Sequence, residues 1–262
     1  MFWRAMDTAG WAVLVFIAVP LLIISGASFT AGDIVTFPPE GFSLRWYEQL
    51  FQRDEFVRSF VQSVVLAVAT AVVALAVGLL TALFMHRYPM RNQELFRAFV
   101  MSPLVLPTIV TGVALLQGLS VLGLGLSFLG LLIGHVVITI PYVVRTVGAG
   151  LSGLDPALEE AAESLGAGPF RVIWKVVMPA IAPSIMAAVI FVFISSFDEV
   201  TVSLFLSDPT VMPLPVRIYA YIDFSLDPMI AALSTLLILL ALGFILLLQW
   251  IFGLDRAFGL KG

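Results

Sequence analysis

Two adjacent carboxylates, Asp198 and Glu199, stand in a strongly apolar stretch of this sequence, just after Ser195, Ser196 and Phe197. Charged groups in such surroundings are costly, so they usually face a cavity or a charged partner. If the stretch is helical, the two carboxylates point about 100° apart, with Ser195 one turn below them. The pair is suited to binding an amine-bearing cation. Alternatively, it pairs with basic groups of a partner subunit or reaches the aqueous interface.

Aromatic side chains in two other segments offer faces on which a cation can rest. Trp46 and Tyr47 lie in one of these segments, and Tyr219 and Tyr221 lie in the other. Because Trp and Tyr also concentrate at membrane interfaces, ordinary anchoring is the favoured interpretation of these rings.

Catalytic and nucleotide-binding patterns are missing from the sequence. It has no Gly-x4-Gly-Lys-Ser/Thr loop for phosphates, no His-Glu-x-x-His pair and no cysteine. The two histidines, His86 and His135, are too far apart for a metal-binding spacing, and we expect His135 to bond within the helix bundle. We therefore expect no catalytic residue, metal or cofactor in this chain, and we predict that it is not an enzyme.

Residues 155–180 carry the start and stop signals of two short helices. Asp155 is a good N-cap, Pro156 suits the first helical position, and Gly166 suits the end of a helix. A second helix is expected from Pro169, because apolar residues follow it at helical spacing. We call this segment the loop hairpin. Taken alone, its pattern also fits a capped connection that only joins two membrane spans.

The elements that must position these residues are membrane helices. Of the 262 residues, 61% are apolar and 11% are charged, whereas soluble domains carry about 25% charged residues. The formal net charge of −4 disfavours nucleic acid as a partner, because nucleic acid needs a basic face. We expect an all-α polytopic membrane bundle that forms a single domain over residues 1–262.

A membrane-spanning helix needs about 20 mainly apolar residues. Six segments qualify, which predicts a multi-pass membrane protein of about six helices. The predicted spans are Ala9 to Phe29, Phe60 to Met85, Phe96 to Leu119, Phe128 to Val147, Pro183 to Leu206 and Met229 to Phe252.

The basic residues predict the orientation of these spans, because cytoplasmic loops are enriched in Lys and Arg. Most of the 13 basic residues fall on one side. This side should be the cytoplasm, and it should hold both termini and the loop of residues 148–182 that contains the loop hairpin. The predicted cytoplasmic residues are Arg4, Arg87, Arg91, Arg97, Arg145, Arg171, Lys175, Arg256 and Lys261, and the others are Arg45, Arg53, Arg58 and Arg217.

The loop hairpin resembles the EAA loop of ABC-importer permeases. The chain has Glu160-Ala161-Ala162, three residues, Gly166, nine residues and then Val-x-Met-Pro, where the family pattern ends in Ile-x-Leu-Pro. The resemblance covers most of the chain from the second span onward and implies a type I ABC-importer transmembrane domain. It also implies that a coupling helix docks on an ATP-binding subunit through Glu160, Ala161, Ala162 and Gly166.

Other segments resemble the permeases of spermidine/putrescine importers, and most nearly the smaller of the two permeases in such systems. These segments are residues 39–47, 197–200 and 214–219. The resemblance leaves related small amine-bearing solutes open as substrates. The substrate-pathway residues that it implies are Asp198, Glu199, Ser196 and Trp46.

Taken together, the resemblance implies a permease subunit of a binding-protein-dependent ABC importer in the bacterial inner membrane. The expected partners are a homologous second permease, two ATP-binding subunits, a periplasmic substrate-binding protein and the lipid bilayer. ATP and Mg²⁺ would be bound by the ATP-binding subunits. The alternative is an ion-coupled secondary transporter, which would show internal inverted repeats, and none is evident in the sequence.

Overall fold

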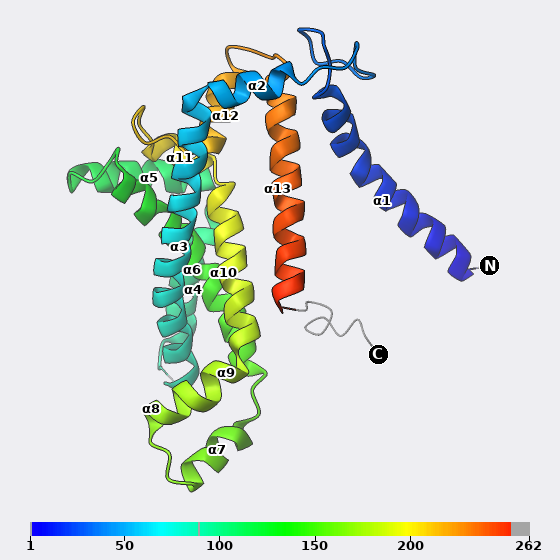
Figure 1. The fold of residues 1–262 in the computed structure, drawn as a ribbon. Helices are drawn as coiled ribbons and strands as arrows, with labels where there is room; N and C mark the ends of the chain where they lie inside the picture. The colour runs from blue at the N-terminus through cyan, green and yellow to red at the C-terminus, as the bar shows by residue number, and fades with distance from the viewer. Residues whose placement is uncertain (1, 89, 253–262) are drawn as a thin grey trace. The chain divides into compact units, whose positions relative to one another are not determined.

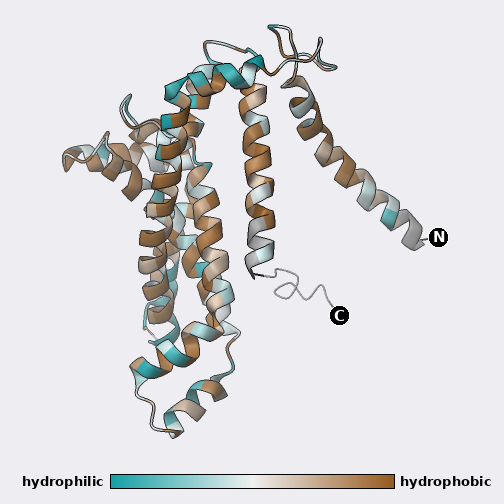
Figure 2. Ribbon diagram, viewed as in Figure 1, coloured by the Kyte–Doolittle hydropathy of each residue, from teal (hydrophilic) through white to brown (hydrophobic). Residues whose placement is uncertain are grey.

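The apolar runs of the sequence form long helices, because hydrocarbon leaves each backbone N–H and C=O to find a partner within its own segment. The computed structural model describes residues 2–88 and 90–252. Within this part of the chain, four helices are long and apolar enough to cross a bilayer. They are α1 (Phe2–Ala27), α3 (Asp54–Arg87), α6 (Phe128–Ser152) and α13 (Met229–Phe252), and Figure 2 shows that hydrophobic residues predominate along α3 and α13.

Two further candidate spans are bent pairs of helices. In the first pair, α4 (Gln93–Val105) and α5 (Thr108–Val121) meet at 104°. In the second pair, residues Pro169–Ala180 meet α10 (Ala182–Phe197) at 68°. With each pair counted as one span, the described residues contain up to six spans, which confirms the predicted all-α membrane fold.

The prediction of one continuous helix from Phe96 to Leu119 is wrong. Leu106 has an extended backbone, with φ −76° and ψ 140°, because a residue that precedes proline is pushed out of the helical region. Pro107 in addition has no N–H with which to continue the hydrogen bonds of α4. The chain therefore turns sharply, and α5 begins at Thr108.

The predicted fifth span, Pro183 to Leu206, is also interrupted. α10 ends at Phe197, and the short helix α11 (Thr201–Leu206) begins after a break of Asp198, Glu199 and Val200. From the sequence we expected Asp198 and Glu199 to lie on one continuous helix. This expectation is wrong, because both residues lie in the break. The Glu199 carboxylate instead accepts a hydrogen bond from a backbone N–H of α11, an alternative to helical continuation that acidic side chains offer.

The described residues pack as two compact units. The first unit lies within Met1–Val57 and Ile218–Gly262, where α1 and α2 (Arg45–Gln52) both pack against α13. The second unit is Arg58–Arg217. α12 (Leu214–Ile222) precedes the turn that leads to α13. The single domain expected over residues 1–262 stays a prediction.

α6 is the central helix of the second unit. It contacts α4, α5, α10 and α11, and Figure 1 shows α3, α6 and α10 running alongside one another. Glycine allows the closest approaches: a Cβ added at Gly78 of α3 would lie 2.6 Å from the Cβ of Val143 of α6. Likewise, a Cβ at Gly134 of α6 would lie 2.5 Å from Cδ1 of Leu206 in α11. Small residues serve membrane helices in this way because association there relies on close packing.

Replacing Gly78 by Ala tests this packing. The added methyl group would overlap Val143, and such overpacking costs about 1–3 kcal/mol, which exceeds the gain in helix propensity. We expect a lower midpoint of thermal unfolding in detergent. The matched control is Gly118→Ala in α5, where an added Cβ meets no atom within 4 Å, and this variant should be at least as stable as the parent protein. Equal losses in both variants would contradict the close contact at Gly78.

Candidate functional site

His135, a buried residue of α6, forms hydrogen bonds with the helices on both sides of the break between α10 and α11. Its Nδ1 lies 2.8 Å from Oγ of Ser196 at the end of α10, and its Nε2 lies 2.8 Å from Oγ of Ser203 in α11. All three side chains are buried, and hydrogen bonds with both ring nitrogens satisfy the imidazole. The prediction that His135 bonds within the helix bundle is confirmed.

A cleft of about 120 Å³ lies beside this break. Ser195 lines it from the last turn of α10, Glu199 lines it from the break, and Thr139 and Tyr142 line it from the middle of α6. The bend between α4 and α5 closes the cleft with residues that include Thr108. Three segments that are far apart in the sequence therefore meet around one carboxylate.

The charge of Glu199 gives the cleft its chemical character. Its Oε1 accepts a hydrogen bond from the N–H of Val202 at 2.9 Å, which fixes the orientation of a half-buried side chain. Among the described residues that line the cleft, none is Lys or Arg, so no cation there balances the carboxylate. The cleft is thus suited to a cationic group, with hydroxyls of Ser195 and Thr139 and the ring of Tyr142 as further contacts.

The other predicted pathway residues are not among the residues that line this cleft. Asp198 caps the end of α10 with an exposed side chain, and Ser196 is buried against His135. Trp46 belongs to the first unit, where it is 5% exposed and donates from Nε1 to the carbonyl oxygen of Thr30. Of the four, only Glu199 lines the cleft, and a role in transport for the other three stays a prediction.

Sequence reasoning did not identify Thr108, Thr139 or Tyr142. Thr139 and Tyr142 are polar groups inside an apolar span, and this was the only signal for them. Their link to Glu199 depends on how α6 packs against α10, which no local pattern in the sequence expresses.

The loop hairpin forms the two short helices that were predicted, α7 (Pro156–Ser164) and α8 (Pro169–Val172). The Asp155 carboxylate accepts a hydrogen bond from the N–H of Ala157 at 3.0 Å, as expected for an N-cap. Gly166 has a φ of +85°, a conformation that residues with a side chain rarely adopt. α8 continues into a π-helical turn η1 (Ile173–Val177) and then α9 (Met178–Ala180).

The loop hairpin presents a mixed acidic and apolar surface. Glu160, Ala161 and Gly166 are exposed, whereas Ala162 is half-buried. The ring of Phe170 is 74% exposed and lies 6.0 Å from the ring of Trp174. Exposed large apolar side chains of this kind mark surfaces that bind other proteins. The predicted contact residues therefore lie where a partner can reach them.

Two contacts fix the loop hairpin to the membrane helices. Val172 of α8 and Val177 of η1 are buried in the core that also contains Val147 of α6. In addition, Arg87 at the end of α3 forms an ion pair with Glu159 of α7, and their side chains are only 23% and 22% exposed. The loop hairpin is therefore in direct contact with both α3 and α6.

Comparison with known proteins shows that this chain is similar to transport proteins. Residues 74–254 match the model of a family described as binding-protein-dependent transport system inner membrane component. The chain is 33% identical to the spermidine/putrescine transport system permease protein PotC of Haemophilus influenzae over 241 residues, which cover 92% of this chain and 93% of PotC. It is 30% identical to the putrescine transport system permease protein PotI of Escherichia coli, with 90% of this chain and 85% of PotI covered.

A solved structure shares the fold at lower identity. The structure of a bacterial ABC transporter involved in the import of the acidic polysaccharide alginate contains a chain that superposes with a TM-score of 0.71. The match covers 95% of this chain and 97% of that chain, at 17% identity. This level of identity supports the fold and says nothing of the substrate.

Exchanging the charges of Arg87 and Glu159 tests whether their ion pair holds the loop hairpin. Arg87→Glu and Glu159→Arg each place like charges together, so α7 should detach more often and trypsin should cleave faster at Arg171 and Lys175. We expect about a two- to fivefold increase in cleavage rate for each single variant, as for an ion pair worth about 0.5–1 kcal/mol. The doubly exchanged variant should restore the parental rate. If the double variant is cleaved as fast as the single variants, the ion pair does not hold the hairpin.

Proposed function

The chain belongs to the family of binding-protein-dependent transport system inner membrane components, and we propose that the solute it carries is spermidine, putrescine or a related small amine. It is an integral inner-membrane permease of an ABC importer, a transport component that works with a substrate-binding protein. The ion-coupled secondary transporter considered from the sequence is not favoured, because similarity to ABC permeases extends over 92% of the chain.

The observation that carries the proposed substrate is the Glu199 carboxylate in its cleft. The cleft lies near the middle of α6, where a 25-residue helix extends about 18 Å to either side. A carboxylate at this depth, with no basic residue among the described residues of the cleft, favours a cation over an anion or a neutral solute. Primary ammonium groups, of the kind a polyamine carries, would fit both the charge and the hydroxyl-lined wall.

Glu199 would offer a weak, transient site on the transport pathway. The cleft of about 120 Å³ has roughly four times the volume of a water molecule in the liquid, enough for an ammonium group with its first methylenes. Asp198, exposed next to it, would attract the cation before it enters, and Ser196 would maintain the break through His135. Trp46 would contribute to the pathway only through the shape of the first unit.

The loop hairpin would connect this permease to ATP hydrolysis. In the proposed assembly, a homologous second permease pairs with this chain, and two ATP-binding subunits bind ATP and Mg²⁺ in the cytoplasm. Glu160, Ala161, Ala162 and Gly166 would contact one of these subunits. Closure of the ATP-binding subunits would move the loop hairpin as a rigid body and switch the bundle between outward- and inward-facing states.

Two further parts of the proposal concern catalysis and orientation. This chain would not itself hydrolyse ATP, because the ATP-binding subunits would carry the phosphate-binding loops. Both termini would lie in the cytoplasm, on the same side as the loop hairpin. Arg256 and Lys261, which contribute to this orientation, lie outside the described residues.

Uptake of radiolabelled spermidine into cells that produce the whole transport system tests the proposed substrate. Glu199→Gln keeps an oxygen that accepts from Val202 but removes the charge that would bind an ammonium group. Hydrogen bonds to charged groups contribute about 1.5–3 kcal/mol, so we expect uptake to fall about 10- to 100-fold. The control, Glu94→Gln at an exposed position in the first turn of α4, should transport normally.

Three outcomes would contradict the proposed function. Unchanged spermidine uptake by Glu199→Gln would show that the carboxylate does not bind the substrate. Absence of uptake by the parent protein for every amine tested would contradict the substrate class. Uptake that persists without ATP and follows an ion gradient would contradict coupling to ATP-binding subunits.

Substitutions at the turn of the loop hairpin test the coupling contact. Gly166→Val forces a β-branched residue to a φ of +85°, which costs about 1–3 kcal/mol and should distort α7. We expect uptake to fall about 5- to 100-fold and less ATP-binding subunit to co-purify, while the amount of the chain in the membrane stays unchanged. In the matched control, Gly168→Val, the residue has a φ of −71° and open space around its Cβ, so transport should persist. Normal coupling in Gly166→Val would refute the role assigned to the turn.

A further inference from the structure

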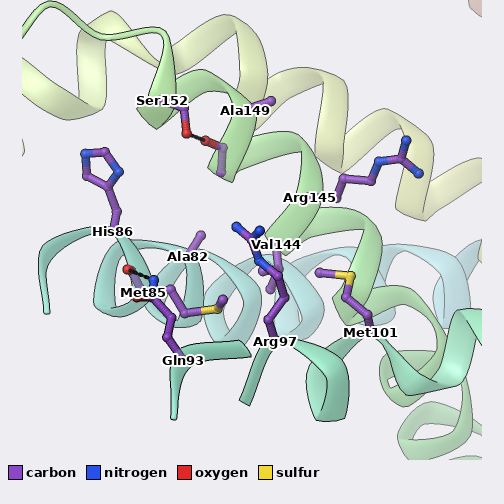
Figure 3. Close-up of a pocket in the computed structure, with 11 residues that line it drawn as sticks. Ala82, Met85, His86, Gln93, Arg97, Met101, Val144, Arg145, Ala149 and Ser152 are labelled. Atoms are coloured by element: carbon purple, nitrogen blue, oxygen red, sulfur yellow. Dashed lines mark hydrogen bonds between the residues drawn. The ribbon is translucent and has the colours of Figure 1, made fainter. Parts of the chain in front are cut away.

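A second hollow in the Arg58–Arg217 unit lies near the loop hairpin. It is a cavity of about 550 Å³ between the end of α3, the first turns of α4 and the last third of α6. Figure 3 shows the Arg97 side chain reaching into this space, with His86 on one side and Arg145 on the other. The transport function proposed above assigns no role to this cavity.

The cavity carries positive charge that nothing in its walls balances. Arg97 and Arg145 are exposed residues with permanently charged guanidinium groups, and the exposed side chain of His86 also lines this space. None of the described residues that line the cavity is acidic. Within the described part of the chain, neither Arg97 nor Arg145 takes part in an ion pair or a side-chain hydrogen bond, in contrast to Arg87. Unbalanced guanidinium groups beside a cavity of this size indicate an anionic ligand.

The cavity is amphipathic and lies close to the ends of membrane helices. Arg145 comes seven residues before the end of α6, which places its backbone about 10 Å from that end. Met85, Met101 and Val144 give the cavity an apolar floor. Phe99 of α4 is 74% exposed, in a segment that is apolar enough to face lipid. This arrangement matches a molecule with an anionic head and an apolar tail.

We propose that this cavity binds the phosphate group of an anionic phospholipid. Arg97 and Arg145 would contact the phosphate oxygens from two helices, since guanidinium groups pair well with phosphate. The acyl chains would lie against the exposed apolar side chains of α4. Basic pockets between membrane helices on the cytoplasmic side recognise lipid headgroups in this manner. Gln93 supports the wall of the site, because its Nε2 donates to the carbonyl oxygen of Met85 at 3.0 Å.

The bound lipid would link α4 to α6 at the end of α3 that carries the ion pair to the loop hairpin. The site would therefore affect the helices that receive the hairpin's motion, without touching the cleft at Glu199. Anionic lipid would then stabilise the permease and support its coupling to ATP hydrolysis.

Native mass spectrometry of the full-length chain, purified with its co-purifying subunits, tests the proposal. The probe is dioleoylphosphatidylglycerol, titrated against the neutral lipid dioleoylphosphatidylcholine. Each basic residue near a lipid headgroup contributes about fivefold in affinity, so Arg97→Gln and Arg145→Gln should each weaken binding about fivefold, and together about 30-fold. The control Arg91→Gln removes an exposed arginine that does not line the cavity, and it should retain parental binding. Equal binding by the parent and the double variant would overturn the proposal.

A second variant blocks the cavity without changing its charge. A Cβ added at Gly148, which lines the cavity, meets no atom within 4 Å, so Gly148→Leu should fill space inside it and also favour the helix. Binding of the anionic lipid should be lost while the protein remains folded. Undiminished lipid binding in this variant would place the lipid elsewhere and overturn the assignment.

Two further measurements separate the lipid from other anions. Inorganic phosphate at millimolar concentration should not displace the lipid, because it lacks the acyl chains that contribute to binding. Displacement by phosphate would assign the cavity to a soluble anion instead of a lipid. If Arg97→Gln and Arg145→Gln release a partner subunit but leave lipid binding intact, the cavity is a protein interface and the proposal fails.

Discussion

The hydrogen bonds of His135 with Ser196 and Ser203 are the contacts on which the geometry of the second unit depends. A helix that breaks at membrane depth is tolerated only where protein buries the interrupted backbone. His135 fastens the helices on both sides of the break to α6, and Gly134 leaves room for α11 to lie against the same helix. Because the break is held in this place, the chain turns at its acidic residues and Glu199 lines the cleft.

One face of α6 lines both the cleft at Glu199 and the basic cavity. The cleft at Glu199 takes residues from the middle of the helix, and the basic cavity takes residues from its last third. Five of the eight α6 residues that line them are spaced alternately by four and three positions, a pattern that keeps side chains on one helical face. The opposite face packs into the core that holds α10 and the second helix of the loop hairpin. The residues of the shared face are Ile138, Tyr142, Arg145, Ala149 and Ser152.

The sequence predicted a cation site at the acidic pair Asp198 and Glu199, but it could not tell which of the two carboxylates lines the cleft. Two neighbouring carboxylates in an apolar run indicated a cation site, and both seemed equally suited to it. In the structure the helix ends at Phe197, so both residues follow it in the break, where Glu199 is half-buried at the cleft and Asp198 is exposed. For Trp46, sequence reasoning suggested a role in the substrate pathway, and the structure shows a contact within the fold. Its ring suggested a cation contact, but its N–H is bonded within the core of the first unit.

The sequence by itself determined the membrane class, the all-α fold and the turn at Gly166, because hydropathy and capping act over a few neighbouring residues. Tertiary structure decided which carboxylate lines the cleft beside Tyr142, and that Arg87 reaches Glu159 across 72 positions of the chain. A hydropathy window averages over a break such as the one at Leu106 and Pro107 and cannot detect it. Contacts between distant segments arise only when the helices pack, so the chemistry of the cleft and of the basic cavity exists only in the folded protein.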